Sequence, residues 1–131
     1  VDQFEWMLQR IKTKPETKSA TISLLTPGSN EQNIPCLNLL DVKLRNGKIH
    51  LQFFFRSQNI FGRQYANLVA LAYLHESLAR RSGYQIGKMK GYIASAHIYE
   101  YDLDAAKMLA NSQPISISDK YYQLGPTSIR T

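Results

Sequence analysis

The sequence has almost no cysteine and no long apolar run. Cys36 is the only cysteine among 131 residues, which excludes both a disulfide within the chain and a structural zinc site built from several thiolates. A single thiol is typical of a reducing compartment, so we expect a cytoplasmic protein. The uncharged apolar segments are much shorter than the roughly 20 residues of a membrane-spanning helix, and the first residues show no signal-peptide pattern. We therefore expect no association with a membrane.

Acidic residues are also scarce, with 10 Asp and Glu against 16 Lys and Arg, which gives a net charge of +6. This balance favours an anionic partner such as a nucleotide phosphate. The basic residues are spread along the chain and no nucleic-acid-binding motif is present, so nucleic acid is not the expected partner. The three histidines, at positions 50, 75 and 97, lack metal-ligand spacing, and no metal centre is expected. The sequence starts with Val1 in place of Met, which favours a processed form or a fragment.

The hydrophobic pattern predicts one α+β domain over residues 1–131. Apolar residues at helical spacing predict helices over 2–12 and 64–82, the first with Asp2 and Glu5 in capping-box positions and the second followed by Gly83. A shorter helix is predicted over 102–109, with Asp102 as its cap. Strands are predicted over 20–25 and 88–99, with a further candidate around Ile115 and Ile117.

A β-hairpin is the clearest local prediction. Strands over 37–45 and 48–55 flank Asn46-Gly47, the residue pair that a type I′ turn requires. This register pairs Arg45 with Lys48 and sets Arg56 opposite Leu37, one residue from Cys36. Alternation gives the hairpin one apolar face, which includes Phe53 and Phe55, but it does not decide whether that face is core or subunit interface.

The segment from Ile34 to Asn67 brings together residue types that a purely structural hairpin does not need. It contains the thiol of Cys36, the guanidinium of Arg56 and the carboxamide of Asn67. Further along, His97 and Tyr99 are two residues apart on a predicted strand and would project from one face, where they could hold a sugar hydroxyl or be buried and satisfied. His75 lies on the apolar stripe of its helix, which favours a hydrogen-bonded core histidine over a catalytic one.

Five motifs follow in one order: Pro35-Cys36, Asn46-Gly47, Arg56-Ser57, Asn67 ten residues after that serine, and His97-Ile98-Tyr99. Together they resemble the second half of a thymidylate synthase, and the form from Ser95 to Glu100 is most similar to archaeal members. Each motif alone is weak, but five in register over about 60 residues are specific. The likeness runs from the first helix to about Leu109. It implies a thymidylate synthase-like mixed sheet packed against a long helix.

The resemblance also implies an activity and a set of roles. The family methylates deoxyuridylate with methylenetetrahydrofolate as co-substrate, and it forms homodimers through face-to-face sheets. Cys36 matches the nucleophile, and a guanidinium nearby favours its thiolate. Arg56 and Ser57 match phosphate ligands. Asn67 matches the residue that reads the uracil edge, because a carboxamide both donates to a carbonyl and accepts from a ring N–H.

The remaining roles follow from the same resemblance. His97 and Tyr99 match the pair that binds the deoxyribose hydroxyl. Asn59 stands where the family has an Asp that contacts folate and helps proton movements; we assign it a catalytic position. Lys18, followed by Ser19, stands where an Arg-Arg pair reaches the phosphate from the partner subunit, so Lys18 is a substrate-binding candidate.

Three functional hypotheses are open at this point, of which a thymidylate synthase-type enzyme is the first. No residue of the sequence matches the family's N-terminal part, which supplies a catalytic Glu and a phosphate-binding Arg loop. The sequence therefore predicts the C-terminal region of such an enzyme, or a short variant. A non-catalytic pyrimidine-nucleotide-binding or interaction module is the second hypothesis. A deoxypyrimidine-monophosphate hydroxymethylase, which adds water to the same intermediate, is the third.

Overall fold

The computed structural model describes residues 2–28 and 34–112. These residues fall into two compact units, the first ending at His97 and the second starting at Ile98. Each unit is described by itself. The expectation of one domain over the whole chain stays a prediction.

Helix α1 (Gln3–Thr13) opens the first unit, as predicted to within one residue. Asp2 caps it: the carboxylate accepts a hydrogen bond from the Glu5 backbone N–H at 3.0 Å. The helix ends at Thr13, and Lys14 is its C-cap, directly before Pro15. Its inward face is formed by Met7, Leu8 and Ile11, which are all buried.

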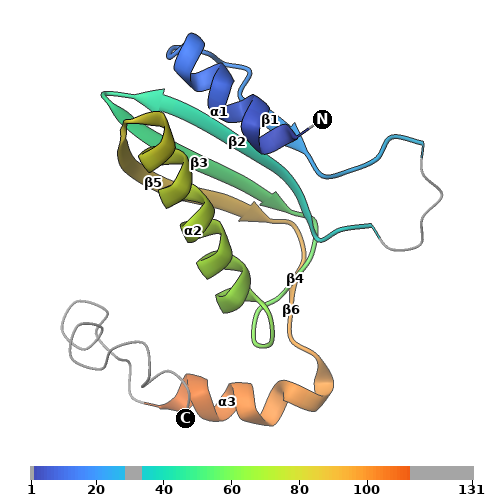
Figure 1. The fold of residues 1–131 in the computed structure, drawn as a ribbon. Helices are drawn as coiled ribbons and strands as arrows, with labels where there is room; N and C mark the ends of the chain where they lie inside the picture. The colour runs from blue at the N-terminus through green and yellow to red at the C-terminus, as the bar shows by residue number, and fades with distance from the viewer. Residues whose placement is uncertain (1, 29–33, 113–131) are drawn as a thin grey trace. The chain divides into compact units, whose positions relative to one another are not determined.

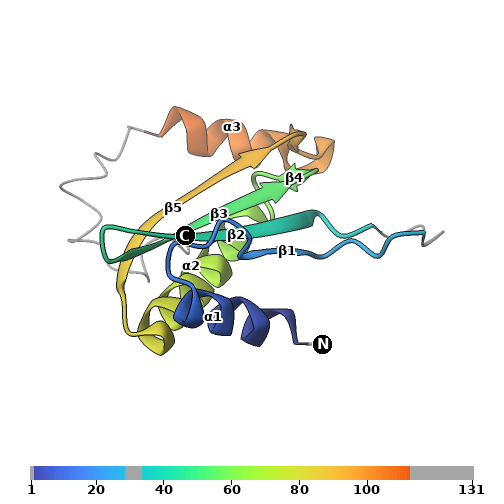
Figure 2. The ribbon, with the colours of Figure 1, turned by 90° about the horizontal axis from the view of Figure 1, so that it is seen from above.

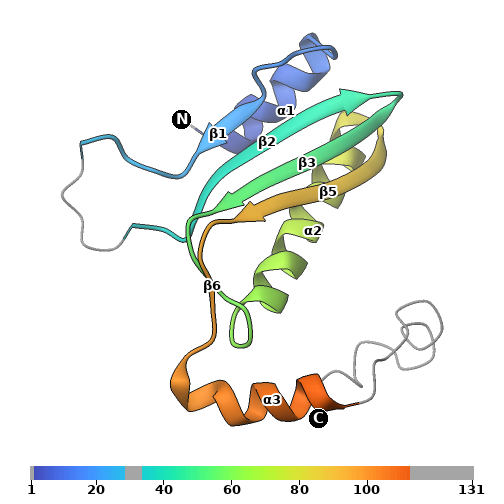
Figure 3. The same ribbon diagram turned by 180° about the vertical axis from the view of Figure 1, so that it is seen from behind.

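A four-stranded mixed sheet forms the centre of the unit, in the order β1-β2-β3-β5. The strands are β1 (Thr21–Ser23), β2 (Leu37–Arg45), β3 (Lys48–Phe55) and β5 (Gln85–Ile93). The first three are antiparallel, whereas β5 is parallel to β3 because a long helix connects them. Figure 3 shows this order across the sheet. The predicted α+β class with a mixed sheet is confirmed.

The hairpin of β2 and β3 has the predicted turn and register. Asn46 and Gly47 have φ of 52° and 71°, so both adopt the left-handed conformation of a type I′ turn. Pairing is regular from Arg45 opposite Lys48 to Leu39 opposite Phe54, and then shifts at Asn38. The bulge places Leu37 opposite Phe55, so the expectation that Arg56 faces Leu37 is wrong by one residue. The Arg56 backbone N–H instead donates to the Cys36 carbonyl at 2.9 Å.

Helix α2 (Gln64–Ser82) lies on the same face of the sheet as α1 (Figures 1 and 2). It ends as predicted at Gly83, whose φ is 81° and whose N–H donates to the Ala79 carbonyl. Buried His75 hydrogen-bonds the Ile49 carbonyl at 2.7 Å, which confirms the core role predicted for it. Phe55 is only 3% exposed on this face. The Phe53/Phe55 face is therefore core, and its alternative role as a subunit interface is wrong.

The predicted strand over 88–99 is wrong at both ends. Strand β5 starts earlier, at Gln85, and ends at Ile93, where its neighbour β3 also ends. The chain then bends and forms the short β6 (Ala96–His97), which pairs with β4 (Gln58–Asn59) in a separate sheet. Strand alternation therefore does not relate His97 to Tyr99, because Tyr99 follows β6.

The second unit contains the 3-10 helix η1 (Glu100–Asp102) and helix α3 (Leu103–Asn111). Asp102 precedes α3 but its side chain makes no capping hydrogen bond, so the predicted cap is wrong. The reason is local: η1 already gives Asp102 a helical backbone, and a capping residue needs an extended one. The strand candidate at Ile115 and Ile117 lies outside the described residues.

Gly91 allows the closest approach within the sheet. A Cβ at this position would come within 2.0 Å of the Phe53 ring, which lies over the glycine. We predict that Gly91→Ala lowers the free energy of unfolding by about 1–3 kcal/mol, because Phe53 must leave its packed position. Denaturant titration measures the change, with Lys90→Ala on the same strand as control. Equal stabilities for the two variants would contradict this packing.

Candidate functional site

The thiol lies at the open end of the hairpin, where side-chain donors hold the backbone on its N-terminal side. The Pro35 carbonyl accepts hydrogen bonds from Asn38 Nδ2 at 2.8 Å and from Arg56 Nε at 3.1 Å. Arg56 Nη2 donates to the Ile34 carbonyl. Cys36 itself is exposed. The bulge at Asn38 and the guanidinium of Arg56 therefore fix the backbone before a solvent-accessible sulfur.

Arg56 keeps donors for a ligand while it holds this segment. A guanidinium has five N–H groups, and the two hydrogen bonds to the Pro35 and Ile34 carbonyls use only part of that set. The side chain is exposed, so the other N–H groups can reach an oxyanion from solvent. Arg56 can thus support the cysteine segment and bind a phosphate at the same time.

Pairing of β4 with β6 brings two further candidates together. The Gln58 N–H donates to the Ser95 carbonyl and the Ile60 N–H donates to the His97 carbonyl, both at 2.9 Å. As a result Ser57 Oγ lies 3.5 Å from His97 Nδ1, at the long end of hydrogen-bonding distance. Ser57 directly follows Arg56, so the thiol, guanidinium, hydroxyl and imidazole lie around one end of the first unit.

The two amide candidates lie next in the chain and make different contacts. Asn59 Oδ1 accepts a hydrogen bond from the Gly62 N–H at 2.9 Å and so shapes the turn into α2. Asn67, in the first turns of α2, donates from Nδ2 to Gln58 Oε1 at 3.1 Å. The sequence prediction missed Gln58, which is 2% exposed. Only its place directly after Arg56-Ser57 could have singled it out.

Lys18 is not at this end of the sheet. The Val42 N–H donates to the Ala20 carbonyl, so the segment before β1 runs beside the turn end of β2. Lys18 is therefore about eight residues, or roughly 25 Å, from Cys36 along the strand. It is exposed, and Arg10 holds its neighbours through Thr17 Oγ1 at 3.3 Å and Ser19 Oγ at 3.0 Å. Within one chain, Lys18 and Cys36 do not form one site.

Tyr99 belongs to the second unit, where its ring stacks on Tyr101 with centroids 5.3 Å apart. Its predicted pairing with His97 on a sugar stays a prediction.

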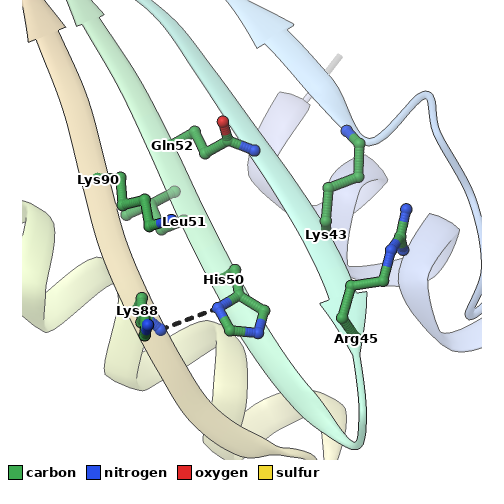
Figure 4. Close-up of a pocket in the computed structure, with 7 residues that line it drawn as sticks. All are labelled: Lys43, Arg45, His50, Leu51, Gln52, Lys88 and Lys90. Atoms are coloured by element: carbon green, nitrogen blue, oxygen red, sulfur yellow. Dashed lines mark hydrogen bonds between the residues drawn. The ribbon is translucent and has the colours of Figure 1, made fainter.

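A shallow basic pocket lies elsewhere, on the sheet face opposite α1 and α2 (Figure 4). Its volume is about 270 Å³, and it is lined by Lys43, Arg45, His50, Leu51, Gln52, Lys88 and Lys90. The His50 ring accepts a hydrogen bond from the Lys88 N–H at 3.0 Å, so in this arrangement Nδ1 carries no proton. Lys43 and Arg45 on β2, like Lys88 and Lys90 on β5, are two residues apart, so the sequence spacing already indicates that each pair projects from one face of the sheet. None of the predicted site residues lines this pocket.

The described residues, 2–28 and 34–112, contain neither a candidate metal site nor a membrane-spanning helix. No group of three or more His, Cys, Asp or Glu side chains there could hold a metal ion. No helix in these ranges is both long and apolar enough to cross a bilayer.

Comparison with known proteins gives the family. Residues 1–121 match the family model described as thymidylate synthase. The chain belongs to the thymidylate synthase family. A relative from Methanosarcina acetivorans, named "Putative thymidylate synthase", is 37% identical over 106 residues, which cover 79% of this chain. A relative of the same name from Methanothermobacter marburgensis is 34% identical over 109 residues, or 82% of the chain.

The match to these thymidylate synthase relatives covers most of this chain but only about half of each relative. In both cases it covers 49% of the relative, so the chain spans about half their length. The predicted resemblance to archaeal-type members of the family is confirmed. The roles of individual residues are not tested by these likenesses and stay predictions.

Exposure of Cys36 gives a prediction that needs no ligand. We expect a thiol reagent such as DTNB to modify one thiol per chain in the native protein, because the sulfur is at the surface. Absorbance of the released thiolate measures the stoichiometry, with the protein in denaturant as the reference for full reaction. A native thiol that reacts only after unfolding would contradict the exposed position.

Proposed function

We propose that the full-length protein methylates deoxyuridylate with methylenetetrahydrofolate. The observation that carries the proposal is the meeting of Cys36, Arg56, Ser57 and His97 at one end of the sheet. Nucleophilic attack on a pyrimidine nucleotide requires an exposed nucleophile close to hydrogen-bond donors for the phosphate and the sugar, and this end of the sheet has both. Family membership supports the same chemistry, and the single cysteine favours the cytoplasm as its location.

Cys36 is the proposed nucleophile. Its thiolate adds to the pyrimidine ring and forms a carbon–sulfur bond, and the electron pair displaced from the ring double bond generates a covalent enolate. The enolate carbon then attacks the methylene carbon of the co-substrate after its bond to one folate nitrogen has opened. Loss of the ring proton and breakage of the bond to the second folate nitrogen leave an exocyclic methylene on the ring. A hydride from the folate reduces this methylene to the methyl group as the sulfur departs, which restores the ring double bond and leaves the folate oxidised to dihydrofolate. The exposed position of Cys36 and the fixed backbone before it suit attack on a ligand that enters from solvent.

The other residues hold the nucleotide. Arg56 supplies free N–H groups and Ser57 a hydroxyl for the phosphate. His97, beside Ser57, binds the deoxyribose hydroxyl. For Tyr99 the same role is supported by the family resemblance alone. Asn67 reads the uracil edge, which favours deoxyuridylate over a cytosine nucleotide and hence methylation over cytosine hydroxymethylation.

Methylenetetrahydrofolate would supply the one-carbon unit and the reducing equivalents. Asn59 is the residue of this chain that we propose faces it. Its Oδ1 is engaged by Gly62, so its Nδ2 hydrogens can donate to a polar atom of the folate. An amide there retains hydrogen bonding but not the charge of an acid.

We also propose a homodimer formed by the sheet face opposite α1 and α2. Near the Cys36 end this face is apolar: Leu39 is 36% and Tyr92 64% exposed, and Tyr92 stacks on Phe54 with centroids 5.7 Å apart. The turn end carries the basic pocket, where two copies would repel each other. A two-fold axis that runs perpendicular to the strands, at the level of Leu39 and Phe54, therefore buries the apolar part of the face. The same axis keeps the basic pockets of the two copies apart.

This dimer explains the position of Lys18. Lys18 lies about five residues, or roughly 17 Å, on one side of the Leu39 level, and Cys36 lies about three residues, or roughly 10 Å, on the other. The proposed axis reverses the strand direction in the partner, so the two sides of the Leu39 level exchange places. Lys18 of one copy thus comes to the level of Cys36 in the other, where it can reach the phosphate.

Release of the C5 hydrogen tests the catalytic proposal. With C5-tritiated deoxyuridylate and methylenetetrahydrofolate, we expect the full-length protein to release tritium to water and to yield thymidylate by mass. Cys36→Ala should lower release by at least about 10³-fold, because no carbon–sulfur bond can form. Binding of deoxyuridylate without release would favour the non-catalytic module, and a hydroxymethyl product would favour the hydroxymethylase.

Tyr92→Glu tests the dimer. We expect the native protein to sediment as a dimer and the variant as a monomer, because the change buries a charge in the centre of the proposed interface. Tyr101→Glu, at a side chain 80% exposed in the second unit, is the control and should leave the dimer intact. A Tyr92→Glu dimer, or a monomeric native protein, would exclude this interface.

A further inference from the structure

We propose that Gln58 is a positioning residue that sets the preference for uracil by fixing the orientation of the Asn67 carboxamide. This inference rests on the function proposed above, in which Asn67 reads the base. It adds a residue whose side chain acts through Asn67.

The backbone of Gln58 is fixed by strand pairing and its side chain is buried. The residue is 2% exposed, its N–H donates to the Ser95 carbonyl at 2.9 Å, and it pairs with Ala96 in the two-stranded sheet. From this position its Oε1 accepts a hydrogen bond from Asn67 Nδ2 at 3.1 Å. A fixed strand thus contacts a half-buried side chain on α2, nine positions further along the chain.

The direction of this hydrogen bond has a chemical consequence. A carboxamide has an oxygen that only accepts and a nitrogen that only donates, although the two groups have nearly the same shape. Because Gln58 presents an oxygen, Asn67 must turn its nitrogen towards Gln58. Asn67 Oδ1 and the second Nδ2 hydrogen are then left for the ligand in a fixed order.

That order distinguishes the two pyrimidines. Uracil has an N–H donor at N3 beside a carbonyl acceptor at C4, whereas cytosine has an acceptor at N3 beside an amino donor. An Asn67 amide in one orientation matches the first pair, and the same amide turned by 180° matches the second. The contact with Gln58 opposes that rotation, so the selectivity that Asn67 provides depends on Gln58.

A second observation points to the same place. In the part of the chain that the structure describes, Gln58 Nε2 and Gln64 Oε1 are buried and have no hydrogen-bond partner. Gln64 lies one helical turn before Asn67, and Gln58 is bonded to Asn67. Buried polar atoms without partners are rare in folded proteins and concentrate at functional sites. Both flank the proposed base-reading residue.

The test compares the affinity of the full-length protein for deoxyuridylate and deoxycytidylate by calorimetry. Gln58→Met keeps the size of the side chain but removes its acceptor, so the Asn67 amide can rotate. We expect the ratio of the two affinities to fall by roughly tenfold or more. Gln58→Glu keeps an acceptor towards Asn67 Nδ2 and should retain the native preference. Gln52→Met, at an exposed glutamine on the open sheet face, is the matched control and should leave the ratio unchanged.

Asn67→Asp separates failure of this inference from failure of the proposed function. This variant should shift preference towards deoxycytidylate, because a protonated acid can donate to N3 while its carbonyl accepts from the amino group. If it does not, Asn67 does not read the base and the function assigned to it fails. If it does, and Gln58→Met retains the native ratio, Gln58 does not orient Asn67 and the inference is overturned.

A measurement on the native protein covers the case in which Gln58→Met does not fold. The Asn67 side-chain amide protons, assigned in NMR spectra by their loss in Asn67→Asp, should show a nuclear Overhauser contact to the Gln58 side chain and slowed exchange with water. Exchange as fast as that of an exposed asparagine would contradict the fixed orientation.

Discussion

The pairing of Arg56 with Cys36 is the constraint on which the rest of the site depends. A regular hairpin would set Arg56 opposite Leu37, but the bulge at Asn38 moves it by one residue. The main chain of Arg56 then bonds Cys36, and its guanidinium bonds the two carbonyls before Cys36. One inserted residue therefore determines which side chains surround the thiol, and the strands that follow bring Ser57 and His97 to the same end.

The two ends of the sheet differ in polarity and charge, and this difference determines the orientation of the two copies in the proposed dimer. On the sheet face opposite α1 and α2, the Cys36 end is apolar, while the turn end carries Lys43, Arg45, Lys88 and Lys90 around one pocket. Among the described residues only Lys43 of these four forms an ion pair, with Asp41. Mutual repulsion of the turn ends and burial of the apolar ends both favour the same antiparallel arrangement of two copies.

Much of this fold could be predicted from sequence because its signals are local. Asn46-Gly47 determines the turn and Gly83 the end of α2, and both act over a few residues. The bulge at Asn38 could not be predicted, since it depends on how distant segments pair. The same holds for the break after Ile93 and for the contact between Gln58 and Asn67. The order of the motifs predicts the candidate site, whereas its supporting residues, such as Gln58, depend on contacts that only the structure shows.

Protection of Cys36 by nucleotide tests the central claim, that the thiol and Arg56 belong to one nucleotide site. Because Cys36 is the sole cysteine, its alkylation rate with iodoacetamide reports on that sulfur alone. The account predicts that deoxyuridylate slows alkylation of the full-length protein in a saturable way, and that Arg56→Gln weakens this protection by roughly tenfold or more. An alkylation rate that does not change at any concentration of deoxyuridylate would contradict it.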